Sequence, residues 1–224
     1  MKYRVEGFVH GGSLFRNLAR LSAAGIPVIT VQHGSGTAGG AYMPGLSDVV
    51  IMVRGRSRAF LAGPPLLMAA TGEVATEEEL GGAEMHTSTS GLGEYLAEDD
   101  RQALGIAREV VGKLSAFKSA CHPGLDPGST VANHHATSTP PWIAGQARND
   151  SQARYPADDL LTLMPAHHRE PVDMREVIAR LVDGSDLLEF KPLYGAATVC
   201  AQASIQGHQV GIITNNGPID VAGA

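Results

Sequence analysis

Residues 28–53 read VITVQHGSGTAGGAYMPGLSDVVIMV, and this stretch decides the fold. Two apolar, β-branched runs, Val28–Val31 and Val49–Val53, predict short buried strands. Between them lies a glycine-rich turn in which Gly39 and Gly40 stand side by side before a short segment that contains Pro44. The pattern predicts a strand, a sharp turn, a short helix and a second strand, as in an α/β fold.

Three known glycine motifs do not fit this turn. The dinucleotide-binding spacing is present, but only nine residues separate Gly39 from the strand at Val49, whereas a Rossmann crossover needs at least about 10–12 residues. A P-loop would need a lysine after the glycine pair, where Ala41 stands. A serine nucleophile elbow would need a glycine two residues before Ser35, where His33 stands.

Two interpretations of the glycine pair remain. The backbone amides of Gly39 and Gly40, at the start of a helix and without side chains beside them, could stabilise an anionic oxygen such as that of a thioester enolate. Alternatively, the glycines allow one backbone to pack closely on another. The turn alone does not separate these two interpretations.

Residues 1–117 carry the signals of an ordered α/β domain. The expected elements, with the residues that signal them, are a helix from a Ser13 cap to Gly25, a strand at 59–61, a proline-opened helix from Gly63, a short helix with Thr76 and Glu79 at capping-box spacing, and a longer helix from Asp99 with an apolar stripe of Leu104, Ala107, Val111 and Leu114.

Two further segments follow. Residues 118–154 are rich in Pro, Gly, Ser and Thr without an apolar period, which predicts a linker or an insertion. Order returns over 155–224, where a β-hairpin alone would be marginal in water, so we expect the opening of a second domain. The elements expected there are a helix between Asp173 and Gly184 and a hairpin of 198–205 with 209–214.

Composition excludes several classes of protein. The 224 residues carry a formal net charge of −6 and 18% charged residues, which argues against disorder and against binding to nucleic acid. No apolar run approaches the roughly 20 residues that span a bilayer, and the N-terminus lacks a signal-peptide pattern. A cytoplasmic protein without membrane contact is therefore predicted, with Cys121 and Cys200 as free thiols.

Three neighbouring pairs of histidine or cysteine invite a metal-site interpretation. They stand at 121–122, 134–135 and 167–168. Their spacings match no zinc pattern. We therefore expect solvated loop histidines and no metal site.

Three strings occur in series along the chain. They are SAAGIPVITVQHGSGTAGGAYMPGLSD at 22–48, FLAGPPLLMAATGE at 60–73 and ELGGAEMHTSTSG at 79–91. In order and spacing they resemble the carboxyltransferase β subunits of biotin-dependent acyl-CoA carboxylases, which include the propionyl-, acetyl-, methylcrotonyl- and geranyl-CoA carboxylases. The resemblance covers about residues 8–115 and resumes at about 155–224. It implies crotonase-like ββα-superhelix domains, a partial N-terminal one that binds acyl-CoA and the start of a second on the biotin side.

The resemblance also implies site residues. Gly39 and Gly40 fall on the glycine pair whose amides hold the thioester oxygen of the acyl-CoA. His86 lies in the third string, but the family's mechanism needs no base there, so we expect a hydrogen-bonded structural histidine. Substrate-binding positions implied around the pair are Thr37, Ala38, Ala41, Tyr42, Phe60, Gly63 and Pro64.

By the same resemblance, the reaction moves CO2 from carboxybiotin to the α-carbon of an acyl-CoA through an enolate. Carboxybiotin would come from a partner biotin carboxylase and carrier subunit, with no cofactor bound covalently to this chain, and the chain would act in a homo-oligomer. Two alternatives stay open. One is an inactive acyl-CoA-binding or assembly remnant. The other is a crotonase-type hydratase or isomerase, which would need an acidic residue over the thioester, and residues 34–45 contain none.

Overall fold

The computed structural model describes residues 5–121, 152–165, 167, 170 and 172–218. The chain divides into two compact units, which are described separately. The first comprises Met1–Val110, Phe190–Ala196 and Asp220–Ala224, and the second comprises Val111–Glu189 and Ala197–Ile219.

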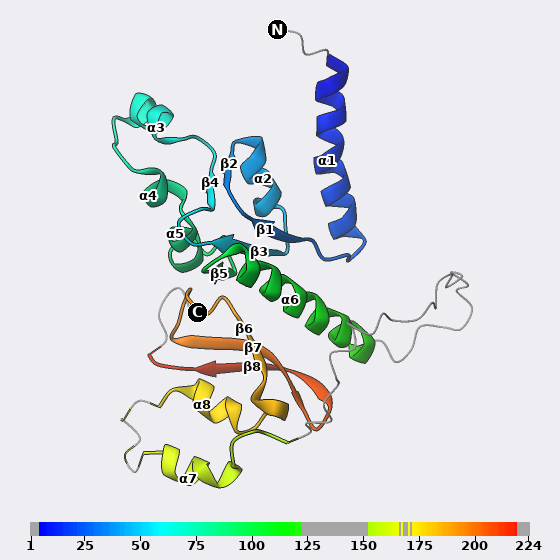
Figure 1. Cartoon of the computed structure of the whole chain (residues 1–224), viewed down its shortest axis with the longest axis vertical. Helices are drawn as coiled ribbons and strands as arrows, with labels where there is room; N and C mark the ends of the chain where they lie inside the picture. The colour runs from blue at the N-terminus through cyan, green and yellow to red at the C-terminus, as the bar shows by residue number, and fades with distance from the viewer. Residues whose placement is uncertain (1–4, 122–151, 166, 168–169, 171, 219–224) are drawn as a thin grey trace, which may run out of the picture. The chain divides into compact units, whose positions relative to one another are not determined.

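The first unit alternates helices and short strands (Figure 1). Its elements are α1 (Val5–Ala23), β1 (Ile29–Gln32), β2 (Ser35–Thr37), α2 (Gly39–Gly45), β3 (Val49–Val53), β4 (Arg58–Phe60), α3 (Pro64–Thr71), α4 (Glu77–Gly81), α5 (Ala83–Ser88), β5 (Tyr95–Ala97) and the beginning of α6 (Asp100–Cys121).

Two parallel ladders form the centre of this unit. β1, β3 and β5 make a three-stranded sheet with β3 in the middle, and Val50–Val53 are buried there. A strand buried on both faces needs such a continuous apolar run. β2 pairs with β4, in a register that sets Thr37 opposite Phe60. The predicted α/β class is confirmed.

The predicted elements compare closely with the observed ones in the glycine-rich region. β1 and β3 lie within one residue of the two predicted strands, and α2 begins at Gly39 itself. The prediction that Ser13 caps the first helix is wrong, because α1 begins at Val5 and contains Ser13. β2 and β5 were not predicted, since strands of three residues are too short to show an alternating pattern.

The predicted apolar stripe of α6 is wrong at two of its four positions, since Ala107 and Leu114 are partly buried. Leu104 and Val111 are half exposed, whereas Ala103 and Val110 are buried. Both pairs have the same spacing of seven residues, so periodicity could not separate them. The prediction chose Leu104 and Val111 because their apolar side chains are larger than that of Ala103. The small side chain of Ala103 suits close packing.

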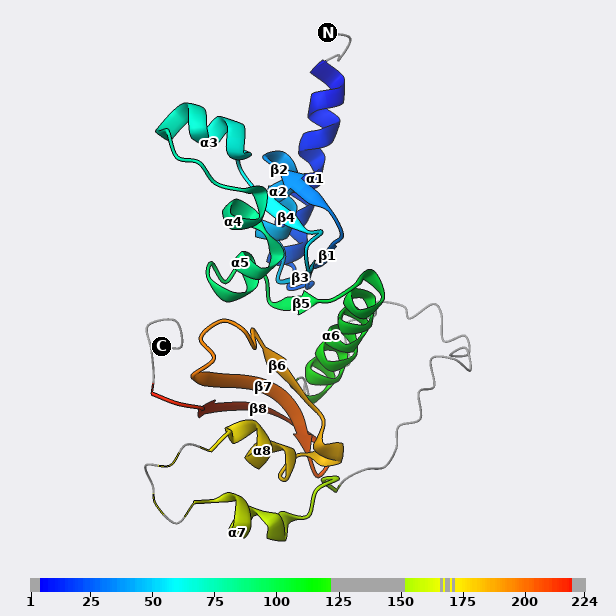
Figure 2. The same cartoon turned by 60° about the vertical axis from the view of Figure 1, so that its left-hand side comes forward.

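The second unit combines short helices with a sheet (Figure 2). Its elements are η1 (Ala157–Asp159), α7 (Leu160–Leu163), α8 (Met174–Ala179), η2 (Asp183–Ser185), β6 (Leu187–Phe190), β7 (Thr198–Ile205) and β8 (His208–Asn215).

The sheet of the second unit has the order β6-β7-β8, and the predicted hairpin of β7 with β8 is confirmed. Ile178 and Val182 pack with Val199 and its neighbours on β7 to form the core. The side chain of Asp173 accepts a hydrogen bond from the Arg175 amide, as expected of a helix cap. The predicted end of this helix near Gly184 is wrong, since α8 ends at Ala179 and a separate 3-10 turn follows.

Most of the predicted insertion at 118–154 lies outside the described residues, although α6 continues past its boundary to Cys121. His122, His134, His135 and His168 lie outside them too. Over the described ranges, no helix has the length and apolar character to cross a membrane, and no three His, Cys, Asp or Glu side chains gather closely enough to hold a metal ion.

Candidate functional site

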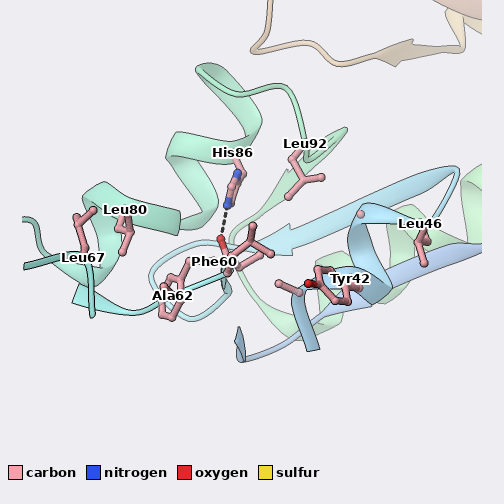
Figure 3. A pocket seen from close by; sticks show the side chains of 12 residues that line it. Tyr42, Leu46, Phe60, Ala62, Leu67, Leu80, His86 and Leu92 are labelled. Carbon is pink, nitrogen blue, oxygen red and sulfur yellow. Dashed lines mark hydrogen bonds between the residues drawn. The ribbon is translucent and has the colours of Figure 1, made fainter. Parts of the chain in front are cut away.

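An apolar pocket of about 600 Å³ lies in the first unit, between α2, β4 and the helices α3 to α5 (Figure 3). Its volume is in the range of roughly 300–1,000 Å³ that is typical of small-molecule sites. The residues that line it are Ala41, Tyr42, Gly45, Leu46, Ala59, Phe60, Leu61, Ala62, Leu67, Leu80, His86 and Leu92.

The glycine pair opens α2 immediately before Ala41 of this pocket. In the described part of the chain, neither the Gly39 nor the Gly40 amide has a hydrogen-bond acceptor, although the Ala41 amide donates to the Ala38 carbonyl at 3.0 Å. Apart from its chain neighbours and the backbone of α2 itself, a Cβ atom built on either glycine would find no heavy atom within 4 Å. Both glycines are exposed, and no packed atom from elsewhere in the described chain crowds the Cβ position of either.

The closely packed glycine of this turn is Gly36. A Cβ atom on Gly36 would lie 3.0 Å from the Gly40 carbonyl oxygen and 3.3 Å from Nε2 of Gln32. Close backbone packing therefore accounts for Gly36, whereas it gives no reason for a glycine at 39 or 40.

The sharp turn before α2 is made by Ala38. Its φ of 51° with a ψ of −113° is a conformation that a residue with a Cβ rarely adopts. Such strain costs about 1–3 kcal/mol and needs support from its surroundings. Part of that support is a hydrogen bond of 3.1 Å from the Ala38 amide to the Phe60 carbonyl, which ties the turn to β4.

His86 is buried and anchors the pocket wall made by β4. Its Nε2 lies 2.6 Å from the Ala59 carbonyl oxygen (Figure 3). Its Nδ1 lies 2.7 Å from Oγ of Ser90. Because a carbonyl can only accept, Nε2 carries the proton and Nδ1 accepts from the Ser90 hydroxyl. Both nitrogens are engaged, so His86 holds the structural role that the sequence predicted.

The contact between α4 and β4 fixes the same wall. A Cβ atom on Gly81 would overlap the Ala59 carbonyl oxygen and lie 2.8 Å from Cδ1 of Phe60. Arg58 forms ion pairs with Glu77 at 3.3 Å and Glu78 at 3.5 Å. The helix therefore lies directly against the strand, at a distance that only glycine allows.

The start of α4 carries the predicted capping box. Oε2 of Glu79 accepts from the Thr76 amide at 2.9 Å and from the Thr76 hydroxyl at 2.8 Å. These hydrogen bonds favour the carboxylate, so they lower the pKa of Glu79. The Glu79 amide donates in return to Oγ1 of Thr76 at 3.2 Å.

A second group of charged residues lies at the carboxyl ends of β1, β3 and β5, outside the pocket lining. Asp100 accepts from His33 and from Arg56, each at 2.8 Å, and Arg54 pairs with Glu98 at 2.9 Å. The hydrogen bond from His33 and the charge of Arg56 lower the pKa of Asp100. Arg54 also pairs with Glu84, so both arginines of this group are engaged in ion pairs.

The predicted site residues are brought together only in part. Ala41, Tyr42 and Phe60 line the pocket, and Gly39 and Gly40 adjoin it in the chain. The remaining four are not among the lining residues: Thr37 pairs with Phe60, Ala38 caps α2, Gly63 caps α3 and Pro64 is the first residue of α3.

Among the lining residues that were not singled out from the sequence are four leucines. They are isolated leucines on separate segments: Leu46, Leu67, Leu80 and Leu92. The strings at 60–73 and 79–91 contain two of them, but no periodicity marks these as lining one cavity. Only the fold brings them to the same place.

Comparison with known proteins gives consistent matches. The model of the carboxyl transferase domain family matches residues 1–223. A probable biotin-dependent acyl-coenzyme A carboxylase beta2 subunit from Mycobacterium tuberculosis is 45% identical over 94% of the chain. A probable mitochondrial methylcrotonoyl-CoA carboxylase beta chain from Drosophila melanogaster is 44% identical over 93% of it.

Among solved structures, a transcarboxylase 12S hexamer with methylmalonyl-coenzyme A and methylmalonic acid bound superposes with a TM-score of 0.69. It shares 30% identity over 95% of this chain and is covered over 37% of its own length. The chain spans 35% of the length of each of the two curated relatives.

Proposed function

The chain belongs to the carboxyl transferase domain family, and from this premise we propose that it forms part of the carboxyltransferase of a biotin-dependent acyl-CoA carboxylase. In this proposal it binds an acyl-CoA, and the amides of Gly39 and Gly40 donate hydrogen bonds to the thioester oxygen. The substrate's acyl group then enters the apolar pocket beside them.

The observation that carries this proposal is the open pair of amides. Removing a proton from the α-carbon of a thioester places negative charge on the carbonyl oxygen. Fixed amide donors stabilise that charge, and each such donor is typically worth about 10²–10³ in rate. Gly39 and Gly40 offer two exposed donors with no acceptor in the described protein, and no packed atom meets the Cβ position of either residue.

The pocket itself supplies no evident base. Among the described residues that line it, none is Asp or Glu, and both nitrogens of His86 are engaged. This disfavours a hydratase or isomerase, which would need an acidic group over the thioester. In the proposed function, carboxybiotin from a partner subunit supplies both CO2 and the proton acceptor, while this chain binds and orients the thioester.

The surrounding predicted residues have supporting roles in this proposal. Thr37 and Ala38 hold the turn against β4 through the register with Phe60 and the Ala38 amide. Gly63 and Pro64 start α3, which carries the pocket residue Leu67. A biotin-carrying partner and a homo-oligomer are proposed because the relatives are named as β subunits or chains and the transcarboxylase structure is a hexamer.

A comparison of two ligands tests this function. Acetyl-CoA and its S-ethyl thioether differ chiefly in the carbonyl oxygen, and calorimetry gives the dissociation constant of each. Two amide hydrogen bonds at about 0.5–1.5 kcal/mol apiece predict that the thioester binds about 5- to 150-fold more tightly. Equal affinities would overturn the role of the amides, and free coenzyme A measures what the nucleotide part contributes.

A further inference from the structure

A buried glutamine lies where β1 meets the ladder of β2 and β4. Gln32 is the last residue of β1 and is only 9% exposed. Its Nε2 donates to the Arg58 carbonyl at 2.5 Å and to the Gly34 carbonyl at 3.1 Å. Its Oε1 is also buried, and no described residue donates a hydrogen bond to it. Burial of an unpaired amide oxygen costs free energy, so packing alone would favour an apolar side chain at this position.

The two carbonyls that Gln32 binds stand at the start of the β2–β4 ladder. Gly34 immediately precedes β2, and its carbonyl also accepts from the amide of Arg58, the first residue of β4, at 3.2 Å. The two strands then run in parallel register over three residues. At the far end, the Ala38 amide donates to the Phe60 carbonyl at 3.1 Å. Gln32 therefore fixes the beginning of a short ladder whose end leads directly into α2.

Gly36 brings the Gln32 side chain and the first turn of α2 to the same point of β2. A Cβ atom on Gly36 would lie 3.3 Å from Nε2 of Gln32 and 3.0 Å from the carbonyl oxygen of Gly40. The backbone at 36 is therefore in close contact with both groups. A displaced Gln32 amide would change the surface on which the first turn of α2 packs.

The turn between β2 and α2 needs support of this kind. The strained backbone of Ala38 persists only where its surroundings hold it in place. Ala38 is itself exposed, so packing of its own side chain contributes little, and the ladder before it must supply the support. A hydrogen bond weakens steeply when its donor turns away from the acceptor. A small rotation of this turn would therefore reduce what the amides of Gly39 and Gly40 can donate.

We propose that Gln32 is a positioning residue for the thioester site. Its side-chain amide holds the β2–β4 ladder against β1 and thereby sets the direction of the Gly39 and Gly40 amides. This inference rests on the proposed function, because it concerns the same two donors. It goes further in assigning their alignment to a buried side chain that is not among the residues lining the pocket.

Gln32→Met tests the inference, because methionine has a similar length and offers no hydrogen-bond donor. Calorimetry on the whole chain gives the dissociation constants of acetyl-CoA and of its S-ethyl thioether, and their ratio measures the preference for the thioester. If the misaligned amides lose one of their two hydrogen bonds, this preference should fall about 2- to 12-fold. The affinity for the thioether should stay unchanged. The infrared carbonyl band of bound acetyl-CoA should move toward its position in water.

The matched control is Thr30→Val on the same strand. Oγ1 of Thr30 lies 2.7 Å from Oγ of Ser47, which donates to the Met43 carbonyl at 2.8 Å. This variant removes a part-buried hydrogen bond between β1 and the segment at the other end of α2. It should lower stability and leave the preference for the thioester as in the wild type. An equal fall in the preference for Thr30→Val and Gln32→Met would overturn the specific role of Gln32.

The remaining outcomes separate the inference from the function. A wild-type preference that persists in Gln32→Met, or a parallel loss of affinity for both ligands, overturns the inference and leaves the proposed function intact. A wild-type chain without any preference for the thioester overturns both. If Gln32→Met unfolds, as circular dichroism would show, Gln32→Asn decides. Its amide is one methylene too short to reach both carbonyls, so its preference should fall below that of the wild type, and an unchanged preference overturns the inference.

Discussion

The glycines on the two sides of the candidate site differ in what surrounds them. At the contact of α4 with β4, a Cβ atom on Gly81 would overlap the backbone of Ala59, and within the turn Gly36 lies against the Gly40 carbonyl. At the start of α2, Gly39 and Gly40 have nothing within 4 Å of the position of a Cβ. Packing therefore requires glycine at 36 and 81, whereas it does not require glycine at 39 or 40.

This difference separates two reasons for finding glycine. A residue that packing requires should be costly to replace whatever the protein does. A pair that packing does not require, in a short helix where alanine would be more stable by about 1 kcal/mol per residue, needs another reason. Open amides beside an apolar pocket supply that reason. Substituting a glycine that packing requires should therefore lower stability, whereas substituting Gly39 or Gly40 should weaken binding.

The largest effect is expected at Gly81. In Gly81→Ala the new methyl group meets backbone atoms that cannot rotate away, so the free energy of unfolding should fall by about 3 kcal/mol. Urea unfolding followed by circular dichroism measures it. The control is Gly105→Ala in α6, where a Cβ meets nothing within 4 Å and helix propensity should raise stability by up to about 1 kcal/mol. Equal changes in the free energy of unfolding for the two variants would contradict the packing role of Gly81.

The next effect is expected at His86. His86→Ala leaves the Ala59 carbonyl and the Ser90 hydroxyl without their partner, which should lower the free energy of unfolding by about 1–3 kcal/mol. His33 pairs with the half-exposed Asp100, so His33→Ala should change the free energy of unfolding by less than about 1 kcal/mol. A His86→Ala variant of unchanged stability that fails to bind acyl-CoA would contradict the structural role.

A smaller effect, confined to binding, is expected at the glycine pair. Gly39→Ala and Gly40→Ala place a methyl group beside the donor amides, so acetyl-CoA should bind about tenfold more weakly, a change of about 1.4 kcal/mol. Calorimetry measures the affinity and urea unfolding shows whether stability is retained or raised. Loss of stability comparable to Gly81→Ala would mean that the pair is a packing feature after all.

The smallest effect concerns the pH dependence of stability that arises from the cap of α4. This is the helix whose Gly81 packs against β4. Because the pKa of Glu79 is lowered in the folded chain, its stabilising contribution is complete above the unfolded value of about 4.3 and is lost as the pH falls through the folded value. Glu79→Gln keeps an acceptor for the capping box without titrating. Unfolding measured between pH 7 and 3 should therefore show a shallower acid decline for Glu79→Gln, and identical curves would refute the cap's contribution.

Sequence patterns predicted most of the elements that surround the site, because strands such as Val49–Val53 and caps such as Thr76 carry local signals. They did not predict β2 or β5, which are held by pairing and not by propensity. Two of the four positions of the α6 stripe were misplaced because neighbouring faces share one periodicity. The pocket could not be foreseen from local pattern, since Leu46, Leu67 and Leu80 are distant in sequence and meet only in the fold.

The most direct test of the account is the carbonyl stretching frequency of a bound thioester. Infrared difference spectra of acetyl-CoA labelled with ¹³C at the carbonyl isolate this band in the complex. Hydrogen bonds from Gly39 and Gly40 should shift it below its position in water, and the shift should diminish in Gly39→Ala and Gly40→Ala. A bound thioester whose carbonyl band matches that of the free ligand would contradict the account.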